Sequence, residues 1–129
     1  MTCVHLSSED ILVIAGYACD DMRVVVRDAG LLESAAHRPS AAVFGEEAYP
    51  DVIDKAAALL RSLAVSRPLF GGDKRTAWLS CVSFPAMNGV DLRPDTDAAE
   101  RLVIAVASGE TDEVKSIAQG LRELVVAEV

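Results

Sequence analysis

The sequence contains few of the residues that carry disulfide and metal chemistry. Its three cysteines, Cys3, Cys19 and Cys81, form no C-x-x-C pair, and the only histidines are His5 and His37. An odd number of widely spaced cysteines argues against a disulfide framework, and the absence of a Cys/His cluster argues against a zinc site. We therefore expect a cytoplasmic protein with no metal held by such a cluster.

Long apolar runs and an excess of positive charge are also absent. No stretch reaches the roughly 18 apolar residues of a membrane span, and Met1 to Asp10 lacks the pattern of an export signal. The net charge is −8, with 12 basic residues against 20 acidic ones. Such a surface repels phosphodiester backbones. We expect no membrane insertion and no direct binding to DNA or RNA.

Aromatic residues are scarce at 5%, whereas hydrophobic residues make up 51% of the chain. The core must therefore consist mainly of Ala, Leu, Val and Ile, a composition that favours packed helices. A length of 129 residues is typical of one domain, and no repeat or linker divides the chain. We predict a single all-α domain over residues 1–129.

Helix-start signals and apolar spacing predict six helices. Ser7 precedes the first, Asp28 caps the second, and Pro50 suits the first turn of the third. The fourth, over 76–87, is apolar almost all round and is expected to be central, with a kink at Pro85. The remaining two follow Asp95 and the acidic run at 111–113. Residues 40–48 read as a loop or small hairpin, which we expect to act as a flap.

The most informative stretch runs from Arg67 to Arg75 and reads RPLFGGDKR. Unpaired N–H groups at a helix start bind anions, and Lys74 and Arg75 directly follow the Gly71-Gly72 turn. The pattern predicts a loop that holds a phosphate or another anion. Asp73 is its only carboxylate, and the stretch contains no His, Cys, Glu or Ser. An ordinary tight turn before a solvated helix start is the alternative.

Several separated blocks, in order, are similar to the Doc (death-on-curing) toxins of the Fic superfamily. The blocks cover 26–35, 37–39, 43–45, 49–50, 55–60, 72–78 and 88–89. The resemblance extends from about residue 24 to the last helix. It implies a Fic/Doc-type helical bundle, with a central helix after the anion-binding loop and a short flap over it.

The resemblance also implies an activity and a partner. Members of this family transfer a phosphate or a nucleotide monophosphate to a protein hydroxyl, with ATP and Mg²⁺ as the corresponding ligands. A small antitoxin protein binds Doc-type toxins. For this chain the resemblance therefore implies a nucleotide site and an antitoxin partner.

The family motif reads His-x-x-x-Asp/Glu-Gly/Ala-Asn-Lys/Gly-Arg, and the resemblance gives its residues their roles. His is the general base, the acid holds Mg²⁺, and the Asn, the loop amides and the cations bind phosphates. In this chain Arg67 stands at the His position, Gly71 at the acid position and Asp73 at the Asn position, while Gly72, Lys74 and Arg75 match.

Each departure from the motif weakens the chemistry. Arg stays protonated, so Arg67 cannot accept a proton as His would. Gly71 offers no side-chain oxygen to Mg²⁺, which normally needs at least one carboxylate. Asp73 puts a negative charge where the family has an amide. We predict that anion binding survives, whereas transfer by the family mechanism is very slow or absent.

Three functional interpretations follow from these residues. In the first, a Doc-like protein has lost transfer but still binds nucleotide, target or antitoxin. In the second, transfer continues with another base, for which His37 is a candidate. In the third, the scaffold serves a different reaction or a different ligand, such as a small anionic metabolite held by Arg67, Lys74 and Arg75. Arg67 could then be a remodelled ligand contact, and Asp73 could replace the missing metal ligand.

Overall fold

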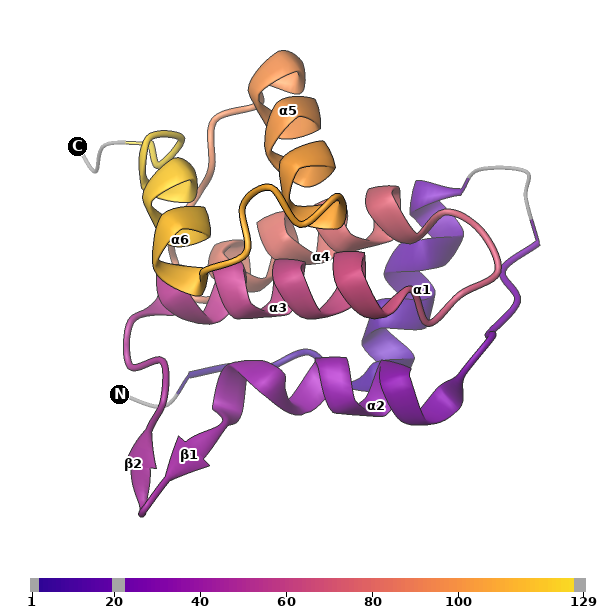
Figure 1. Cartoon of the computed structure of the whole chain (residues 1–129), viewed down its shortest axis with the longest axis horizontal. Coiled ribbons are helices and arrows are strands. Elements are labelled where there is room, and N and C mark those ends of the chain that lie inside the picture. The colour runs from indigo at the N-terminus through magenta and orange to yellow at the C-terminus, as the bar shows by residue number, and fades with distance from the viewer. Residues whose placement is uncertain (1–2, 20–22, 127–129) are drawn as a thin grey trace.

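The computed structural model describes residues 3–19 and 23–126, in which the regular secondary structure is helical apart from one small hairpin (Figure 1). The all-α prediction is confirmed for this part of the chain. Its elements, in chain order, are α1 (Ser8–Ala18), α2 (Ala29–His37), a short 3₁₀ helix η1 (Arg38–Ser40), β1 (Ala42–Val43), β2 (Glu46–Glu47), α3 (Val52–Ser66), α4 (Asp73–Met87), α5 (Thr96–Ala107) and α6 (Val114–Arg122). No helix in the described residues is both long and apolar enough to span a membrane.

Most helices begin where their capping residues predict. Ser7 forms a reciprocal capping box with Asp10 at α1, and the side chains of Asp28 and Asp95 accept N–H groups of α2 and α5. The start of α3 differs slightly from the prediction, because Asp51 is the N-cap and Pro50 precedes the helix. A side-chain oxygen at the N-cap satisfies a helix N–H that otherwise has no partner, which explains why these positions could be located from the sequence.

Helices α3 and α4 run along each other at the centre of the fold (Figure 1). Helix α3 is the more deeply buried of the two, because α2, α5 and α6 also pack against it. Alanines on both helices, including Ala57 and Ala77, are fully buried and allow close packing. Helix α4 keeps part of its surface accessible, although Cys81 and Phe84 are completely buried.

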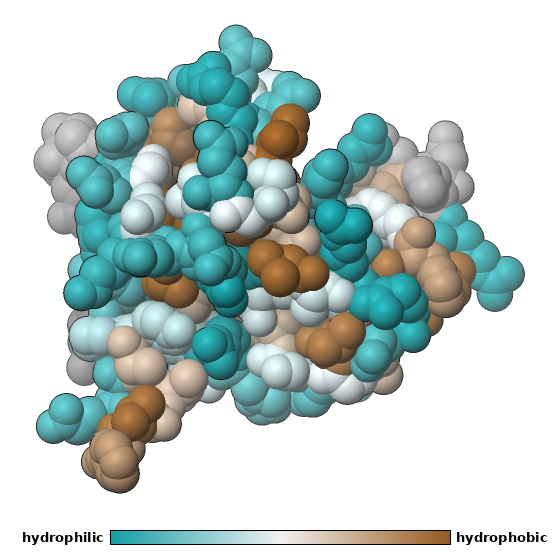
Figure 2. Space-filling model, viewed as in Figure 1, coloured by the Kyte–Doolittle hydropathy of each residue, from teal (hydrophilic) through white to brown (hydrophobic). Residues whose placement is uncertain are grey.

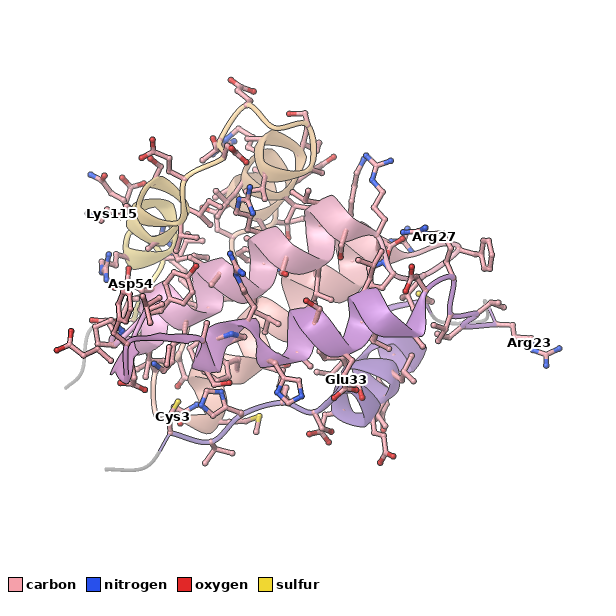
Figure 3. The ribbon with its side chains drawn as sticks, turned by 60° about the horizontal axis from the view of Figure 1, so that its bottom comes forward. Cys3, Arg23, Arg27, Glu33, Asp54 and Lys115 are labelled. Carbon is pink, nitrogen blue, oxygen red and sulfur yellow. The ribbon has the colours of Figure 1, made fainter. Side chains whose placement is uncertain are left out.

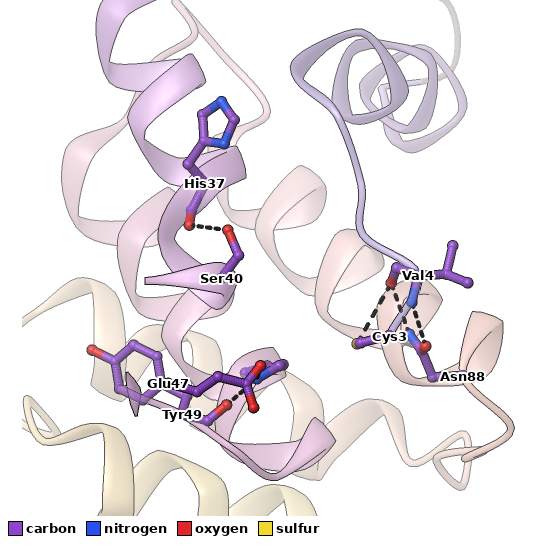
Figure 4. Close-up of polar contacts among 8 residues, drawn as sticks. Cys3, Val4, His37, Ser40, Glu47, Tyr49 and Asn88 are labelled. Atoms are coloured by element: carbon purple, nitrogen blue, oxygen red, sulfur yellow. Dashed lines mark hydrogen bonds and ion pairs between the residues drawn. The ribbon is translucent and has the colours of Figure 1, made fainter. Parts of the chain in front are cut away.

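The end of α4 is joined to the N-terminal segment. Pro85 lies inside the final turn, and Gly89, at φ +85°, takes a left-handed conformation just beyond it. The Asn88 amide donates to the carbonyl of Val4 at 2.9 Å and accepts the Val4 N–H at 2.8 Å (Figure 4). Asn88 therefore both ends the helix region and fixes residues before α1.

The predicted small hairpin is present as β1 and β2, with Phe44 and Gly45 in its turn at positive φ. Its hydrophobic tip projects from the body (Figures 1 and 2). Its location corrects our expectation of a flap over the anion loop. The buried Lys55 ammonium donates to Glu47 at 3.1 Å and to the Tyr49 carbonyl, which fixes the hairpin at the N-terminal end of α3. The anion loop follows the opposite end, about 20 Å away along the helix.

Candidate functional site

A pocket of about 390 Å³ lies at the N-terminus of α4, where the loop from α3 meets the end of α1. Its lining residues come from both places: Cys19, Arg67, Gly72, Asp73, Lys74 and Arg75. Five of the six residues predicted from the sequence are thus brought together. Gly71 lies in the same loop, exposed, but outside this lining set. Cys19 was not predicted, because no local signal connects the end of α1 with a loop 50 residues away.

Gly72 is the N-cap of α4 and takes φ +77°. Glycine adopts this conformation readily, whereas residues with a Cβ rarely do. It supplies no side-chain cap to the first turn. The positive end of the α4 dipole therefore faces the pocket beside the side chains of Lys74 and Arg75, an arrangement that attracts anions.

Arg67 is the C-cap of α3 and also takes a left-handed conformation, at φ +49° and ψ +65°. Strained conformations of this kind cost on the order of 1–3 kcal/mol and persist only where the surroundings enforce them. Arg67 is among the residues that line the pocket, so three basic residues, Arg67, Lys74 and Arg75, surround the same space. The position that the family resemblance assigns to a base is therefore held by a strained, exposed cation.

Asp73 is the first residue of α4, and its Oδ1 accepts the N–H of Leu69 at 3.0 Å. Burial raises the pKa of Asp73 above its usual range, partly offset by this hydrogen bond and by the charges of Arg27 and Arg67. The Asp73 carboxylate thus links the two ends of the segment from residue 69 to residue 73. Its single negative charge is the one acidic contribution to the pocket lining.

A neighbouring segment forms the outer edge of this loop. The N–H groups of Arg27 and Asp28 donate to the Pro68 carbonyl at 2.7 and 3.0 Å, and Phe70 donates to the Val25 carbonyl at 3.0 Å. Val26 and Leu69 form an isolated antiparallel bridge. Residues 25–28, just before α2, therefore hold the 67–75 loop through its backbone.

Both histidines lie outside the pocket lining. His37 pairs with Glu33 on α2, with 2.9 Å between Nε2 and Oε1. His5 packs on Phe84, and its pKa is lowered by burial and by the charge of Lys55. Its neighbour Val4 is bound by Asn88 at the C-terminal end of α4, whereas the pocket lies at the N-terminal end of that helix. The position of His37 on α2 therefore does not support the hypothesis that it is a replacement base.

A second pocket, of about 560 Å³, lies between α4 and α5. It shares Lys74 and Arg75 with the first pocket, and its other lining residues are Trp78, Thr96, Ala99, Glu100, Val103 and Ile104. The helical spacing of Trp78 with Leu79 and Val82 in the sequence favours a core position for Trp78. It does pack against the core, but one part of it remains accessible and lines this largely apolar pocket.

Comparison with known proteins agrees with the arrangement of fold and loop. The model of the Fic/DOC family matches residues 5–84. The chain belongs to the Fic/DOC family. It is also 45% identical, over 125 residues, to a protein of Mycolicibacterium smegmatis named Toxin Doc, and the match covers 95% of each chain. The family resemblance noted from the separated blocks is thereby confirmed.

The Mg²⁺ site that the Fic/DOC family implies can be compared with the donors present here. Gly71 has no side chain where the family has a carboxylate. Asp73 offers the nearest carboxylate in the loop, but its Oδ1 already accepts the Leu69 N–H, and Arg27 and Arg67 contribute positive charge beside it. Mg²⁺ is usually held by one or two carboxylates together with substrate phosphates, and cations beside a carboxylate repel it. These residues do not fit the metal site of the family.

Proposed function

We propose that this Fic/DOC protein is a Doc-like member of a toxin–antitoxin pair that binds the phosphates of a nucleotide but transfers them very slowly or not at all. The observation that carries the proposal is the pocket itself. Arg67, Lys74 and Arg75 line it at the N-terminus of α4, and the first of these replaces the general base of the family. The cations support binding, whereas the chemical step lacks the histidine base of the family motif.

The size of the expected loss follows from the role of the base. A positioned general base typically contributes a factor of about 100 to 10,000 to the rate, and an Arg side chain cannot take its place. Asp73 is the single carboxylate in the pocket lining, and its Oδ1 accepts a hydrogen bond from the loop backbone. Transfer with a non-standard base is therefore the less favoured interpretation.

The similarity to Toxin Doc supports a protein partner. We propose that a small antitoxin protein binds this chain, as the family resemblance implies. A reading frame for such a protein beside the gene, and copurification of its product with this chain, are the expected results. Failure of a neighbouring small protein to bind would remove the antitoxin part of the proposal and leave the pocket unaffected.

The decisive experiment is calorimetric titration with ATP, with and without Mg²⁺. Three proteins are compared: the native chain, the triple variant Arg67→His, Gly71→Asp, Asp73→Asn, and Lys115→Ala as a control for loss of charge on the distant α6. We expect the native chain and the control to bind ATP equally. We expect labelled phosphate or AMP to reach a protein target only with the triple variant.

Other outcomes point to different functions. Transfer by the native chain that is lost in Lys74→Ala would show an active enzyme with another base. Absence of ATP binding at millimolar concentration would overturn the nucleotide proposal. Binding of a small anion such as pyrophosphate without ATP binding would then favour the third interpretation, an anionic metabolite held by Arg67, Lys74 and Arg75.

A further inference from the structure

We infer that Arg27 is a positioning residue that fixes the backbone conformation of Arg67 and so directs its guanidinium into the pocket. The Arg27 Nε donates to the Arg67 carbonyl at 2.7 Å, and its Nη2 donates to the Ser66 carbonyl at 2.7 Å. These two carbonyls belong to the peptide groups on either side of the Arg67 Cα. One rigid guanidinium therefore holds both peptide planes that define φ and ψ of residue 67.

Residue 67 needs such a restraint because of its conformation. Helices commonly end in a left-handed residue, but that residue is usually glycine. Arg67 adopts φ +49° despite its Cβ. The carbonyls of the last helical turn also lack partners within the helix, and a cation near them interacts favourably with the helix dipole. At the end of α3, Arg27 both restrains the conformation of residue 67 and places a cation beside these carbonyls.

The position of Arg27 is itself well determined. Its backbone and that of Asp28 bind the Pro68 carbonyl, and Val26 pairs with Leu69. Figure 3 shows Arg27 against the body of the protein, whereas Arg23, from the same connection, extends outward. Arg23 makes no hydrogen bond or ion pair with any other residue that the structure describes. It therefore provides a matched control for loss of one positive charge on this segment.

The effect on a ligand rests on the proposed function, because it assumes an anion in the pocket. Arg27 itself is not among the lining residues. Its loss would allow residue 67 to relax to negative φ, which moves the Arg67 guanidinium away from the anion. Arg27 also contributes positive charge near Asp73, so geometry and charge must be separated. Arg27→Lys keeps the charge but lacks the planar fork that reaches both carbonyls.

The first test measures the φ angle of residue 67 by NMR scalar couplings and backbone chemical shifts in the free protein. We expect positive φ in the native chain and in Arg23→Gln, and loss of this conformation in both Arg27→Lys and Arg27→Gln. A titration with inorganic pyrophosphate should show an affinity about tenfold lower for both Arg27 variants than for the control. Retention of positive φ in Arg27→Gln would overturn the inference.

A second test places glycine, which adopts positive φ readily, at residue 67. Arg67→Gly can adopt positive φ without help, so Arg27→Lys should reduce unfolding stability clearly in the native background and much less in the Arg67→Gly background. Equal losses in the two backgrounds would show that Arg27 does not act through residue 67. If the native chain binds no pyrophosphate, the proposed function fails, whereas the φ measurement and the stability cycle still decide the role of Arg27.

Discussion

The thiol of Cys19 lies directly against the backbone of Gly72. The sulfur occupies the space where a side chain at residue 72 would begin, so that a Cβ there would overlap it. Residue 72 also takes φ +77°. The end of α1 and the start of α4 therefore meet at a position that only glycine fits, for two independent reasons.

Gly72→Ala should consequently destabilise the protein by roughly 2–4 kcal/mol, about 1 from the positive φ and the rest from overlap with Cys19. Chemical denaturation of the variant measures this loss. Gly109→Ala is a matched control, because Gly109 has φ +85° but open space around the added Cβ, and should lose only the conformational part. Similar losses in the two variants would show that the Cys19 contact is unimportant.

The ion pair between the buried Lys55 and the exposed Glu47 should respond asymmetrically to mutation. Lys55 is 1% exposed, whereas the Glu47 side chain is 59% exposed. Glu47→Ala leaves the buried ammonium hydrogen-bonded to the Tyr49 carbonyl and should cost about 1.5 kcal/mol, while Lys55→Met removes the buried charge and should cost about half as much. Urea unfolding at pH 7 compares them. A larger loss for Lys55→Met would contradict this account.

Asp73→Asn should stabilise the protein at neutral pH. Because burial raises the pKa of Asp73, ionisation of this carboxyl disfavours the folded state. The penalty is absent below the unfolded pKa of about 3.9 and develops as pH rises through the folded pKa. Since Asp73 is partly exposed, we expect a gain in Tm of roughly 1–3 °C at pH 7 that disappears near pH 3. A gain that persists at pH 3 would assign the effect to something other than charge.

His5 should make the protein sensitive to mild acid. Burial and the Lys55 charge lower the pKa of His5, so the unfolded chain binds this proton more readily than the folded one. Its contribution to stability is therefore present above the unfolded pKa of about 6.5 and is lost as pH falls toward the folded pKa. His5→Phe keeps an aromatic ring beside Phe84 and should reduce the drop in Tm between pH 7 and pH 5 by roughly 2 °C. An unchanged drop would exclude His5 as its source.

Features that depend on a few adjacent residues could be predicted from the sequence. Asp28 and Asp95 cap helices through side chains that reach only three residues along the chain. The pocket residues Gly72, Lys74 and Arg75 likewise belong to one continuous motif, which the fold carries at a helix start. For the helix caps and for the pocket motif, the identities of neighbouring residues were sufficient for the prediction.

Features that depend on contacts between distant segments were missed. Arg27 and Arg67 are 40 residues apart, and no pattern near either one indicates their hydrogen bond. The hairpin was predicted from its turn residues, but its location depends on the contact between Lys55 of α3 and Glu47 of the hairpin. A lysine within an otherwise apolar helix face was the available signal, because such a residue must find a partner when buried.

The two pockets share a wall made by Lys74 and Arg75. A substitution at either residue alters both cavities at once, and its phenotype cannot be assigned to one of them. Arg67 and Trp78 each line only one cavity. These two positions are therefore where genetic screens can separate the contribution of the charged cavity from that of the apolar one.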